Sequence, residues 1–389
     1  MDEQEAITKA QALLNRPGDA NVSPLAVYRR AAKADSVQQR RPNVVLIMME
    51  SMSAKFMKHF GQSETLTPFL DSLYTRSISF RNFYSAGIHT NHGLYATLYS
   101  FPAMMKRNLM KGSVIPRYSG LPTVLKENGY YNLFFMTHEG QYDNMNAFFR
   151  TNGYDEVFSQ EDYPADKVVN SFGVQDDFLY DYAIPVLNQR AATGQPFFAT
   201  LLSISNHPPY VIPPFFHPKT SEPEMQIVEY ADWALRQFFE EARKQPWFDN
   251  TIFVLEGDHG KLVGDAECEL PESYNHIPLM IYSNRIQPEE KTAFGGQVDI
   301  QPTILGLLNI DYLQNNFGVD LLKEERPCMF YTADNMVVGR NDTLLYLYNY
   351  ETQQELTYDI GNGKLNAVPM DDSFCLLYTS PSPRDRTRS

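Results

Sequence analysis

Short apolar runs that alternate with helix-forming segments constrain the fold of this chain more than any other feature of its sequence. The runs have the length of buried strands and lie at 44–49, 78–84, 131–136, 197–204, 251–255 and 277–282. Helical periodicity fills the segments between and after them, at 68–74, after Thr90, and at 122–128, 174–189, 225–244 and 302–308. This alternation predicts βαβ units, so we expect an α/β fold with a mainly parallel central sheet and helices on both faces.

The chain is expected to divide into four parts. Residues 1–40 predict a helical lead-in, with helices over Glu3–Asn15 and Leu25–Ala34, and residues 41–325 form the α/β domain. Short strands between turn residues predict a small antiparallel β annex of the same unit at 326–375. Residues 376–389, LLYTSPSPRDRTRS, resemble translated sequencing adapter, and we interpret them as a non-native tail.

Charge and composition exclude several classes of protein. Lys and Arg total 33 against 47 Asp and Glu, and a net charge of -14 disfavours a nucleic-acid binder, whose phosphate contacts need clustered cations. At 43% hydrophobic residues the chain is too apolar to be disordered, yet no window reaches the roughly 18 apolar residues of a membrane span. Cys268, Cys328 and Cys375 predict neither a disulfide framework nor a zinc site.

Polar side chains follow four of the expected strands. Glu50 ends the first, His138 another, and the pairs Asn206-His207 and Asp258-His259 end two more. Ligands of open α/β sheets bind at the carboxyl ends of the strands, so these groups are expected at one edge. Two carboxylates and an imidazole, from Glu50, Asp258 and His259, form a donor set for one divalent cation, with Mn²⁺ favoured and Mg²⁺ or Zn²⁺ also suitable.

Thr90 stands at the expected start of a helix and has two interpretations. A threonine there is commonly the helix N-cap. A hydroxyl beside a cation and a helix N-terminus is also suited to attack a tetrahedral oxyanion ester, because the cation lowers the pKa of the hydroxyl and the N–H groups bind the anion.

Four motifs in order then resemble the alkaline phosphatase/sulfatase superfamily, most closely its lipoteichoic acid synthase and phosphoglycerol transferase branch. They are RPNVVLIMMES with Glu50, AGIHTNHG with Thr90, LEGDHG with Asp258-His259, and QVDIQPTIL near Asp299. The resemblance runs from about Arg41 to Leu322. It implies an enzyme in which Glu50, Thr90, Asp258 and His259 bind the metal ion and Thr90 is the nucleophile.

The same resemblance implies where the substrate binds. The segment THEGQYDNMNAFF is similar to the substrate-binding stretch of phosphoglycerol transferases and implies roles for His138, Asp143 and Asn144, although it lacks the Trp and Arg of the lipoteichoic acid enzymes. SNHPPY implies a substrate contact for His207. His276, just before an apolar strand, is a further candidate for a phosphate contact.

The implied partner is a phospholipid or glycan-linked phosphate ester, with no nucleic acid. The implied place of action is the extracytoplasmic face of a bacterial cell membrane, in the periplasm or outside the cell. The relatives carry membrane helices before the catalytic domain, so we expect membrane association through segments missing from this chain.

Alternatives remain open at this stage. Sulfatases convert a Cys or Ser in a CxPxR-type motif to formylglycine, and the sequence here is Thr90-Asn91-His92-Gly93, so phosphoryl transfer is favoured over sulfate-ester hydrolysis. A non-catalytic binding module on the same fold is a further possibility. Transfer to an acceptor and hydrolysis by water are not separated, and either His207 or His138 is expected to protonate the leaving alcohol. Asp299 is expected to cap the 302–308 helix.

Overall fold

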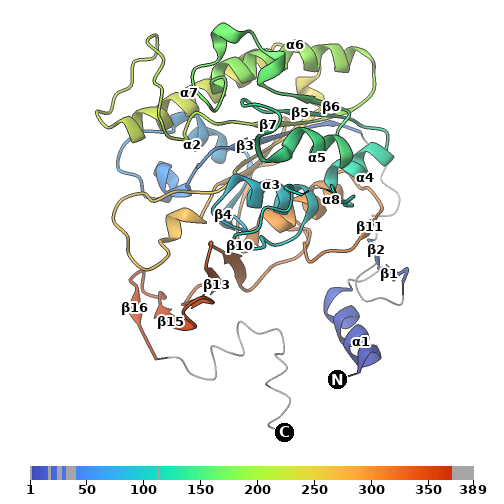
Figure 1. The fold of residues 1–389 in the computed structure, drawn as a ribbon, viewed down its shortest axis with the longest axis vertical. Coiled ribbons are helices and arrows are strands. Elements are labelled where there is room, and N and C mark those ends of the chain that lie inside the picture. Colours follow the sequence, from blue (N-terminus) through green and yellow to red (C-terminus); the bar gives the residue numbers. More distant parts are fainter. Residues whose placement is uncertain (1, 16–18, 24–28, 32–40, 113, 370–389) are drawn as a thin grey trace.

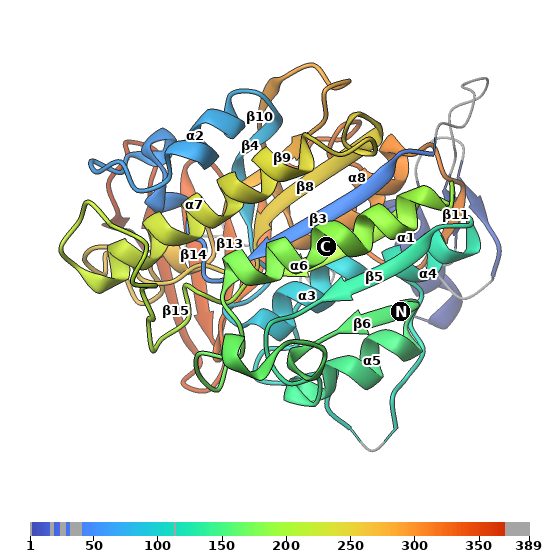
Figure 2. The same cartoon turned by 90° about the horizontal axis from the view of Figure 1, so that it is seen from above.

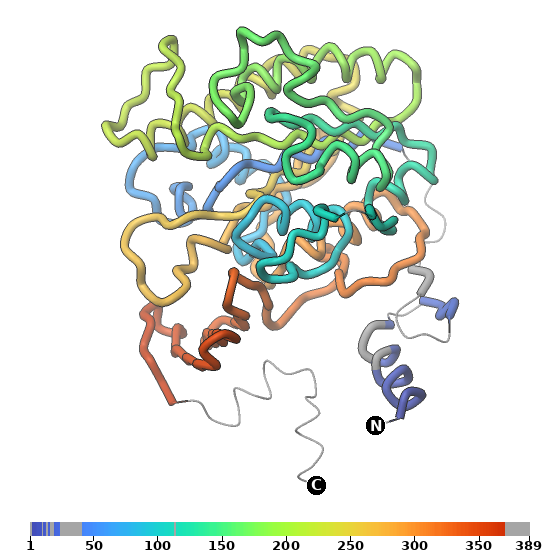
Figure 3. Tube along the Cα trace, in the orientation of Figure 1, coloured from blue at the N-terminus to red at the C-terminus, as the bar shows by residue number. Residues whose placement is uncertain are grey.

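The structure is a computed structural model that describes residues 2–15, 19–23, 29–31, 41–112 and 114–369. One large sheet runs through its centre, and helices pack on both faces (Figure 1). The tube in Figure 3 shows the segment 329–367, in red, beside this body at one end. The adapter-like tail at 376–389 and Cys375 lie outside the described residues.

The central sheet has eight strands in the order β10-β4-β9-β8-β3-β7-β5-β6. Their bounds are β3 Asn43–Met49, β4 Ile78–Tyr84, β5 Tyr131–Phe135, β6 Glu156–Phe158, β7 Phe197–Leu202, β8 Thr251–Gly257, β9 Leu279–Tyr282 and β10 Glu289–Gly296. Within this sheet β9 runs antiparallel to both of its neighbours, and every other neighbouring pair is parallel. The expected α/β fold with a mainly parallel sheet is confirmed.

Two layers of helices cover this sheet, which explains why β3 is apolar from Val44 to Met49. Val45 and Ile47 face the core under α2 (Pro68–Tyr74), α6 (Asp176–Ala192) and α7 (Pro223–Ala242). Val44 and Leu46 face the core under α3 (Thr90–Tyr99), α4 (Leu121–Glu127), α5 (Met145–Thr151) and α8 (Ile300–Leu307). Figure 2 looks onto the layer of α6 and α7 above β3 and β8. A strand buried on both faces has no polar alternation.

The C-terminal annex is a separate antiparallel sheet, as expected. Its strands are β12 Met329–Thr332, β13 Met336–Arg340, β14 Leu344–Asn349, β15 Gln354–Asp359 and β16 Asn366–Ala367, paired in chain order. Tyr331 of β12 stacks on Tyr84 of the central sheet, with ring centroids 5.1 Å apart. Arg340 of β13 forms an ion pair with Glu272 beside them. These buried contacts join the annex to the α/β body.

The lead-in agrees with the sequence in one helix and departs from it in the other. Helix α1, Glu3–Leu14, begins at Asp2, whose carboxylate accepts the N–H of Glu5. The helix expected over Leu25–Ala34 is wrong where the structure describes it, because Arg29–Ala31 is strand β2. It pairs with β1 (Ala20–Asn21) and with β11 (Tyr312–Gln314), and that distant partner overrides the local helical pattern.

Asp299 has a structural role, but its side chain does not cap α8 as expected. One carboxylate oxygen accepts the N–H of Gly296 at 3.0 Å and the other accepts that of Val319 at 2.9 Å. Arg326 donates to both oxygens, with the shortest contact at 2.6 Å. The buried ion pair therefore joins the start of α8 to the segment before the annex.

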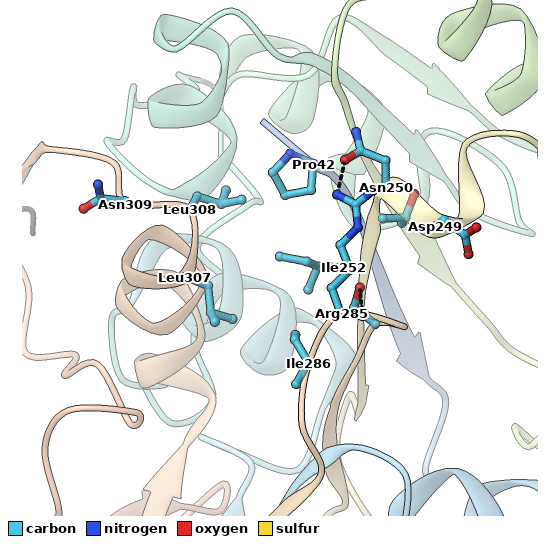
Figure 4. A pocket seen from close by; sticks show the side chains of 11 residues that line it. Pro42, Asp249, Asn250, Ile252, Arg285, Ile286, Leu307, Leu308 and Asn309 are labelled. Carbon is cyan, nitrogen blue, oxygen red and sulfur yellow. Dashed lines mark hydrogen bonds between the residues drawn. The ribbon is translucent and has the colours of Figure 1, made fainter. Parts of the chain in front are cut away.

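An apolar pocket of about 180 Å³ lies at the amino ends of β3 and β8 (Figure 4). Ile252, Ile286 and Leu307 line it, and Arg285 donates to the Oδ1 of Asn250 at its rim, at 3.0 Å. Glu50 and Asp258 follow the opposite, carboxyl ends of the same two strands. The pocket is therefore separate from the polar groups singled out in the sequence.

Asp232 on α7 caps the first turn of α2, and replacing it gives a test of the fold. Its carboxylate accepts the N–H groups of Phe69 and Leu70, each at 2.9 Å, and burial raises the pKa of Asp232 to about 7. A raised pKa favours the folded state at low pH, and this contribution is lost as the pH rises through about 7.

We expect Asp232→Asn to lower the free energy of unfolding by about 1–3 kcal/mol at pH 5, because the amide presents an NH2 group to one of the two N–H donors that the carboxyl oxygens accept. The deficit relative to the wild-type protein should shrink toward pH 8. Thermal melts of both metal-free proteins at each pH measure this difference. A stability deficit of Asp232→Asn that grows with pH would contradict the raised pKa of Asp232.

Candidate active site

The register of two neighbouring strands places Glu50 beside Asp258. Strands β3 and β8 are parallel, with Met48 opposite Glu256 and Met49 opposite Gly257. The next residue of each strand is then Glu50 and Asp258, and both side chains are buried. The N–H of Asp258 also donates to the carbonyl of Met49 at 3.0 Å. The sheet itself therefore brings these two carboxylates together.

His259 completes a group of three potential metal ligands. Ligand atoms of Glu50, Asp258 and His259 all lie within 4.8 Å of one another. The Nε2 of His259 is 3.8 Å from Glu50 Oε1 and 3.6 Å from Asp258 Oδ2. The Nδ1 of the same ring donates to the carbonyl of Gly260 at 2.7 Å. A hydrogen bond at Nδ1 fixes the tautomer that offers the Nε2 lone pair to a metal ion.

Two features of the Glu50 and Asp258 carboxylates indicate a cation site. Asp258 Oδ1 accepts the N–H groups of Ser51 and His259, while Oδ2 is buried without a hydrogen-bond partner. Burial and the neighbouring Asp258 raise the pKa of Glu50 well above its ordinary value. An orphaned oxygen and two crowded carboxyl groups are costly unless a positive charge lies between them. The residues therefore fit a divalent cation with oxygen and nitrogen ligands.

Thr90 brings a hydroxyl to this group from the first turn of α3. Its Oγ1 donates to Glu50 Oε2 at 3.4 Å. His89 is the N-cap residue of α3, and its side chain makes no capping hydrogen bond. Gly93 allows this approach, because a Cβ there would lie 2.2 Å from the carbonyl oxygen of Asp258. All four side chains expected to bind the metal ion, at 50, 90, 258 and 259, thus lie together.

Gln297 joins the segment before Thr90 to the segment that carries Asp258. Its Nε2 donates to the carbonyls of Gly257 and Asp258, at 3.1 and 2.8 Å, and its Oε1 accepts the N–H of Ala86 at 2.9 Å. The sequence motif around Asp299 contained this residue, but its amide was not singled out. Gln297 therefore positions the segment that leads into Thr90 against the one that carries Asp258.

The C-terminal annex also contacts the segment before Thr90. The Oδ1 of Asp334, between β12 and β13, lies 2.7 Å from the Nε2 of His89. The backbone N–H of Thr332 donates to the carbonyl of Ala86 at 3.0 Å. Next to this contact, burial lowers the pKa of His92 to about 4. The sequence did not connect the annex with Thr90, because 245 residues separate His89 from Asp334.

His138 and His207 follow β5 and β7 on the same edge of the sheet. Each donates its Nδ1 hydrogen to the carbonyl of the next residue, at 3.1 and 2.6 Å respectively. Burial lowers the pKa of His138, and the charge of His207 acts on it in the same direction. Tyr142 lies 4.6 Å from the His138 ring, and Phe172 lies 4.1 Å from the His207 ring, between centroids. Two histidines and two aromatic rings thus stand near one another.

Asp143 and Asn144 are held by the connection between α3 and α4. Asp143 accepts from Asn108 Nδ2 and from Lys111 Nζ, each at 2.7 Å, and the Nδ2 of Asn144 donates to the carbonyl of Met110 at 3.0 Å. Both residues have positive φ, at 52° and 62°. Non-glycine residues in this region carry strain that packing must offset, and such strain clusters at ligand sites.

His276 is not among the three grouped metal-ligand residues. Its ring packs against Tyr84 and Phe60, each 5.1 Å away between centroids. Its Nε2 donates to the carbonyl of Arg81 at 2.8 Å, and its Nδ1 is 3.8 Å from Glu272 Oε1. These contacts fix the orientation of the His276 ring, and its role as a phosphate contact stays a prediction.

Lys261 is a residue of the site that sequence reasoning missed. Its Nζ donates to Asn206 Oδ1 at 2.6 Å and to Tyr210 OH at 3.1 Å. The Nδ2 of Asn206 in turn donates to the carbonyls of Glu50 and Ser51, at 3.2 and 3.1 Å. Burial lowers the pKa of Lys261 to about 8. Its position directly after the GDHG motif was the one feature of the sequence that could have indicated a place in the site.

The mainly parallel sheet carries a hydroxyl, two carboxylates and an imidazole at its carboxyl edge, and this combination defines a class of enzymes. Comparison with known proteins identifies that class. The family model described as Sulfatase matches residues 42–310, so the chain belongs to the sulfatase family. The expected superfamily and enzyme class are thereby confirmed.

Particular relatives are lipoteichoic acid synthases and phosphoglycerol transferases. Lipoteichoic acid synthase 2 of Bacillus subtilis is 24% identical over 73% of this chain and 47% of its own length. Phosphoglycerol transferase I of Xanthomonas campestris is 25% identical over 78% of this chain and 46% of its own length. The chain thus spans about half the length of these relatives.

Solved structures show the same fold. An alkaline phosphatase superfamily protein from Vibrio parahaemolyticus has a TM-score of 0.84 and 27% identity, covering 96% of this chain and 93% of that one. A lipoteichoic acid synthase from Listeria monocytogenes has a TM-score of 0.75 and 20% identity, covering 88% and 91%. Among the helices that the structure describes, none combines the length and apolar character needed to cross a bilayer.

Proposed function

We propose that this chain catalyses metal-dependent phosphoglycerol transfer from a glycerophosphate-type lipid head group, with Thr90 as nucleophile. The observation that carries the proposal is the Thr90 hydroxyl, 3.4 Å from a carboxylate of the three-ligand group. The names of the related synthases and transferases support the substrate class. Glu50, Thr90, Asp258 and His259 would hold one divalent cation, with Mn²⁺ favoured and Mg²⁺ or Zn²⁺ as alternatives.

The chain's own residues account for a covalent route. The Thr90 hydroxyl loses its proton to solvent and its Oγ1 attacks the phosphorus of a phosphodiester, so that a bond forms from Oγ1 to phosphorus as the bond to the leaving alcohol oxygen breaks. His207 or His138, on the same edge of the sheet, gives a proton to that oxygen. A bound divalent cation supplies positive charge that acidifies the hydroxyl and offsets the charge of the phosphoryl oxygens. The phosphothreonine ester then passes its group to an acceptor hydroxyl or to water.

Sulfate-ester hydrolysis is the alternative that the family name suggests, but a threonine at position 90 disfavours it. Formylglycine is made from Cys or Ser, whereas threonine stands at the position that contacts Glu50. A non-catalytic role is disfavoured because the hydroxyl and all three ligand groups are present. We further propose action at the extracytoplasmic face of a bacterial membrane, with membrane association through segments outside this chain and no nucleic-acid partner.

Incubation of manganese-loaded protein with phosphatidylglycerol vesicles tests this function. We expect release of diacylglycerol that stops when EDTA removes the metal ion and returns on adding manganese. An aryl sulfate, incubated in parallel, should not be hydrolysed. Hydrolysis of the aryl sulfate without diacylglycerol release would replace phosphoglycerol transfer with sulfatase activity.

A further inference from the structure

The amine of Lys261 is a partly buried cation whose two contacts are both neutral. Nζ donates to the amide oxygen of Asn206 and to the hydroxyl of Tyr210. It also lies 4.7 Å from the Tyr210 ring centroid and 5.4 Å from that of Phe56. In the part of the chain that the structure describes, no Asp or Glu oxygen lies within the 4.0 Å of an ion pair with it. Buried cations without an anionic partner are costly and need a reason.

A single side chain connects this amine to the metal-ligand group. Asn206 accepts from Lys261 through Oδ1 and donates through Nδ2 to the carbonyls of Glu50 and Ser51. Both ends of the amide are therefore used, and its orientation is fixed. Glu224, at the start of α7, and Glu50 are close enough to interact electrostatically with Lys261, but neither makes an ion pair with it. The amine thus has a set position beside the candidate metal ligands.

Two aromatic rings lie beside the amine of Lys261. Phe56 and Tyr210 replace part of the water around it, which strengthens its attraction for an anion. A cation fixed in such a place binds an oxyanion at little cost in side-chain entropy, because Asn206 and Tyr210 already hold it. The missing counter-charge is then expected to arrive with the ligand.

We propose that Lys261, held by Asn206 and Tyr210, forms a subsite for a non-bridging phosphoryl oxygen of the substrate. The inference rests on the proposed function for the identity of the substrate, but the subsite itself is defined for any phosphoryl oxyanion. The amine binds and orients the phosphoryl group next to Thr90 and provides charge that the ligands Glu50 and Asp258 cannot. Lys261 is thus a substrate-binding residue that the motifs of the sequence did not assign.

Binding of inorganic phosphate to manganese-loaded protein, measured by isothermal titration calorimetry, tests the subsite. We expect Lys261→Gln to raise the Kd for phosphate at least about tenfold, the loss of one charged contact. Lys55→Gln is the matched control: Lys55 is exposed, and its Nζ lies 3.7 Å from where a Cβ of Gly264 would stand, in the segment that follows Lys261. It removes the same charge from that neighbourhood, and its Kd should remain within about twofold.

A purely structural lysine would give a different pattern. We expect Lys261→Gln and Lys261→Met to melt within about 3 °C of the wild-type protein, a change of roughly 1 kcal/mol or less. Unchanged phosphate affinity in Lys261→Gln overturns the subsite. So does a wild-type protein that binds no phosphate, or a large loss of melting temperature in both variants.

The two proposals fail in separable ways. If phosphate binding depends on Lys261 but phosphatidylglycerol is not cleaved, the subsite stands and the proposed function falls. If phosphatidylglycerol is cleaved and Lys261→Gln binds phosphate normally, the function stands and the subsite falls.

Discussion

Replacing Thr90 with alanine is expected to lower the turnover of phosphatidylglycerol by about three orders of magnitude or more, because the covalent route loses its nucleophile. Folding should survive, since the side chain is only part-buried and its one hydrogen bond, to Glu50, is long at 3.4 Å. Manganese should still bind, because Glu50, Asp258 and His259 remain. Steady-state rates and metal content of the purified variant measure both effects.

Two companion variants sharpen this test. Thr90→Ser keeps a hydroxyl at the same place and should retain measurable turnover. Asn91→Ala changes the next residue of the same helical turn without touching a proposed ligand, and its rate should stay within a fewfold of the wild-type rate. A near-normal rate in Thr90→Ala would show that Thr90 is only the first residue of a helix and not the nucleophile.

Replacing Asp258 with asparagine is expected to abolish both manganese binding and turnover. The amide oxygen can still accept the N–H groups of Ser51 and His259, but the orphaned Oδ2 and its charge are gone. Loss of a direct ligand should exceed the roughly 10–100-fold cost in affinity or activity seen for groups that only support a ligand. Without metal, the variant should melt at or above the wild-type temperature, because Glu50 loses the carboxylate crowding it.

Asp265→Asn is the matched control for this variant. Asp265 is exposed, and it lies seven residues further along the chain. Elemental analysis and calorimetric titration with manganese compare the two proteins. Undiminished manganese affinity in Asp258→Asn would remove Asp258 from the ligand set.

The positions of Glu50 and Asp258 could be predicted from sequence because one physical rule determines them. Each follows a strand with an apolar run, Val44–Met49 in β3 and Ile252–Leu255 in β8, and the two strands are buried, parallel and aligned in register. Residues directly after them must share the carboxyl edge of the sheet. Thr90 was identified for a similar local reason, as the first residue of a helix.

Contacts between distant segments could not be predicted in this way. Lys261 meets Asn206 across 55 residues, and the direction of its side chain depends on Tyr210 and Phe56. Strand β10, with the sequence EEKTAFGG, was missed because it is an edge strand whose first half is charged. The packing of the His276 ring against Phe60 and Tyr84 likewise joins segments that are far apart in the sequence.

Mass spectrometry of the quenched enzyme tests the central claim most directly. Wild-type protein loaded with manganese is mixed with phosphatidylglycerol, stopped in acid within the first turnovers, digested and compared with Thr90→Ala. The account predicts a phosphoglycerol adduct on the peptide that contains Thr90, placed on its Oγ1 by fragmentation and missing from the alanine variant. Turnover of phosphatidylglycerol by the wild-type protein with no adduct on this peptide, or with an adduct on another residue, would contradict it.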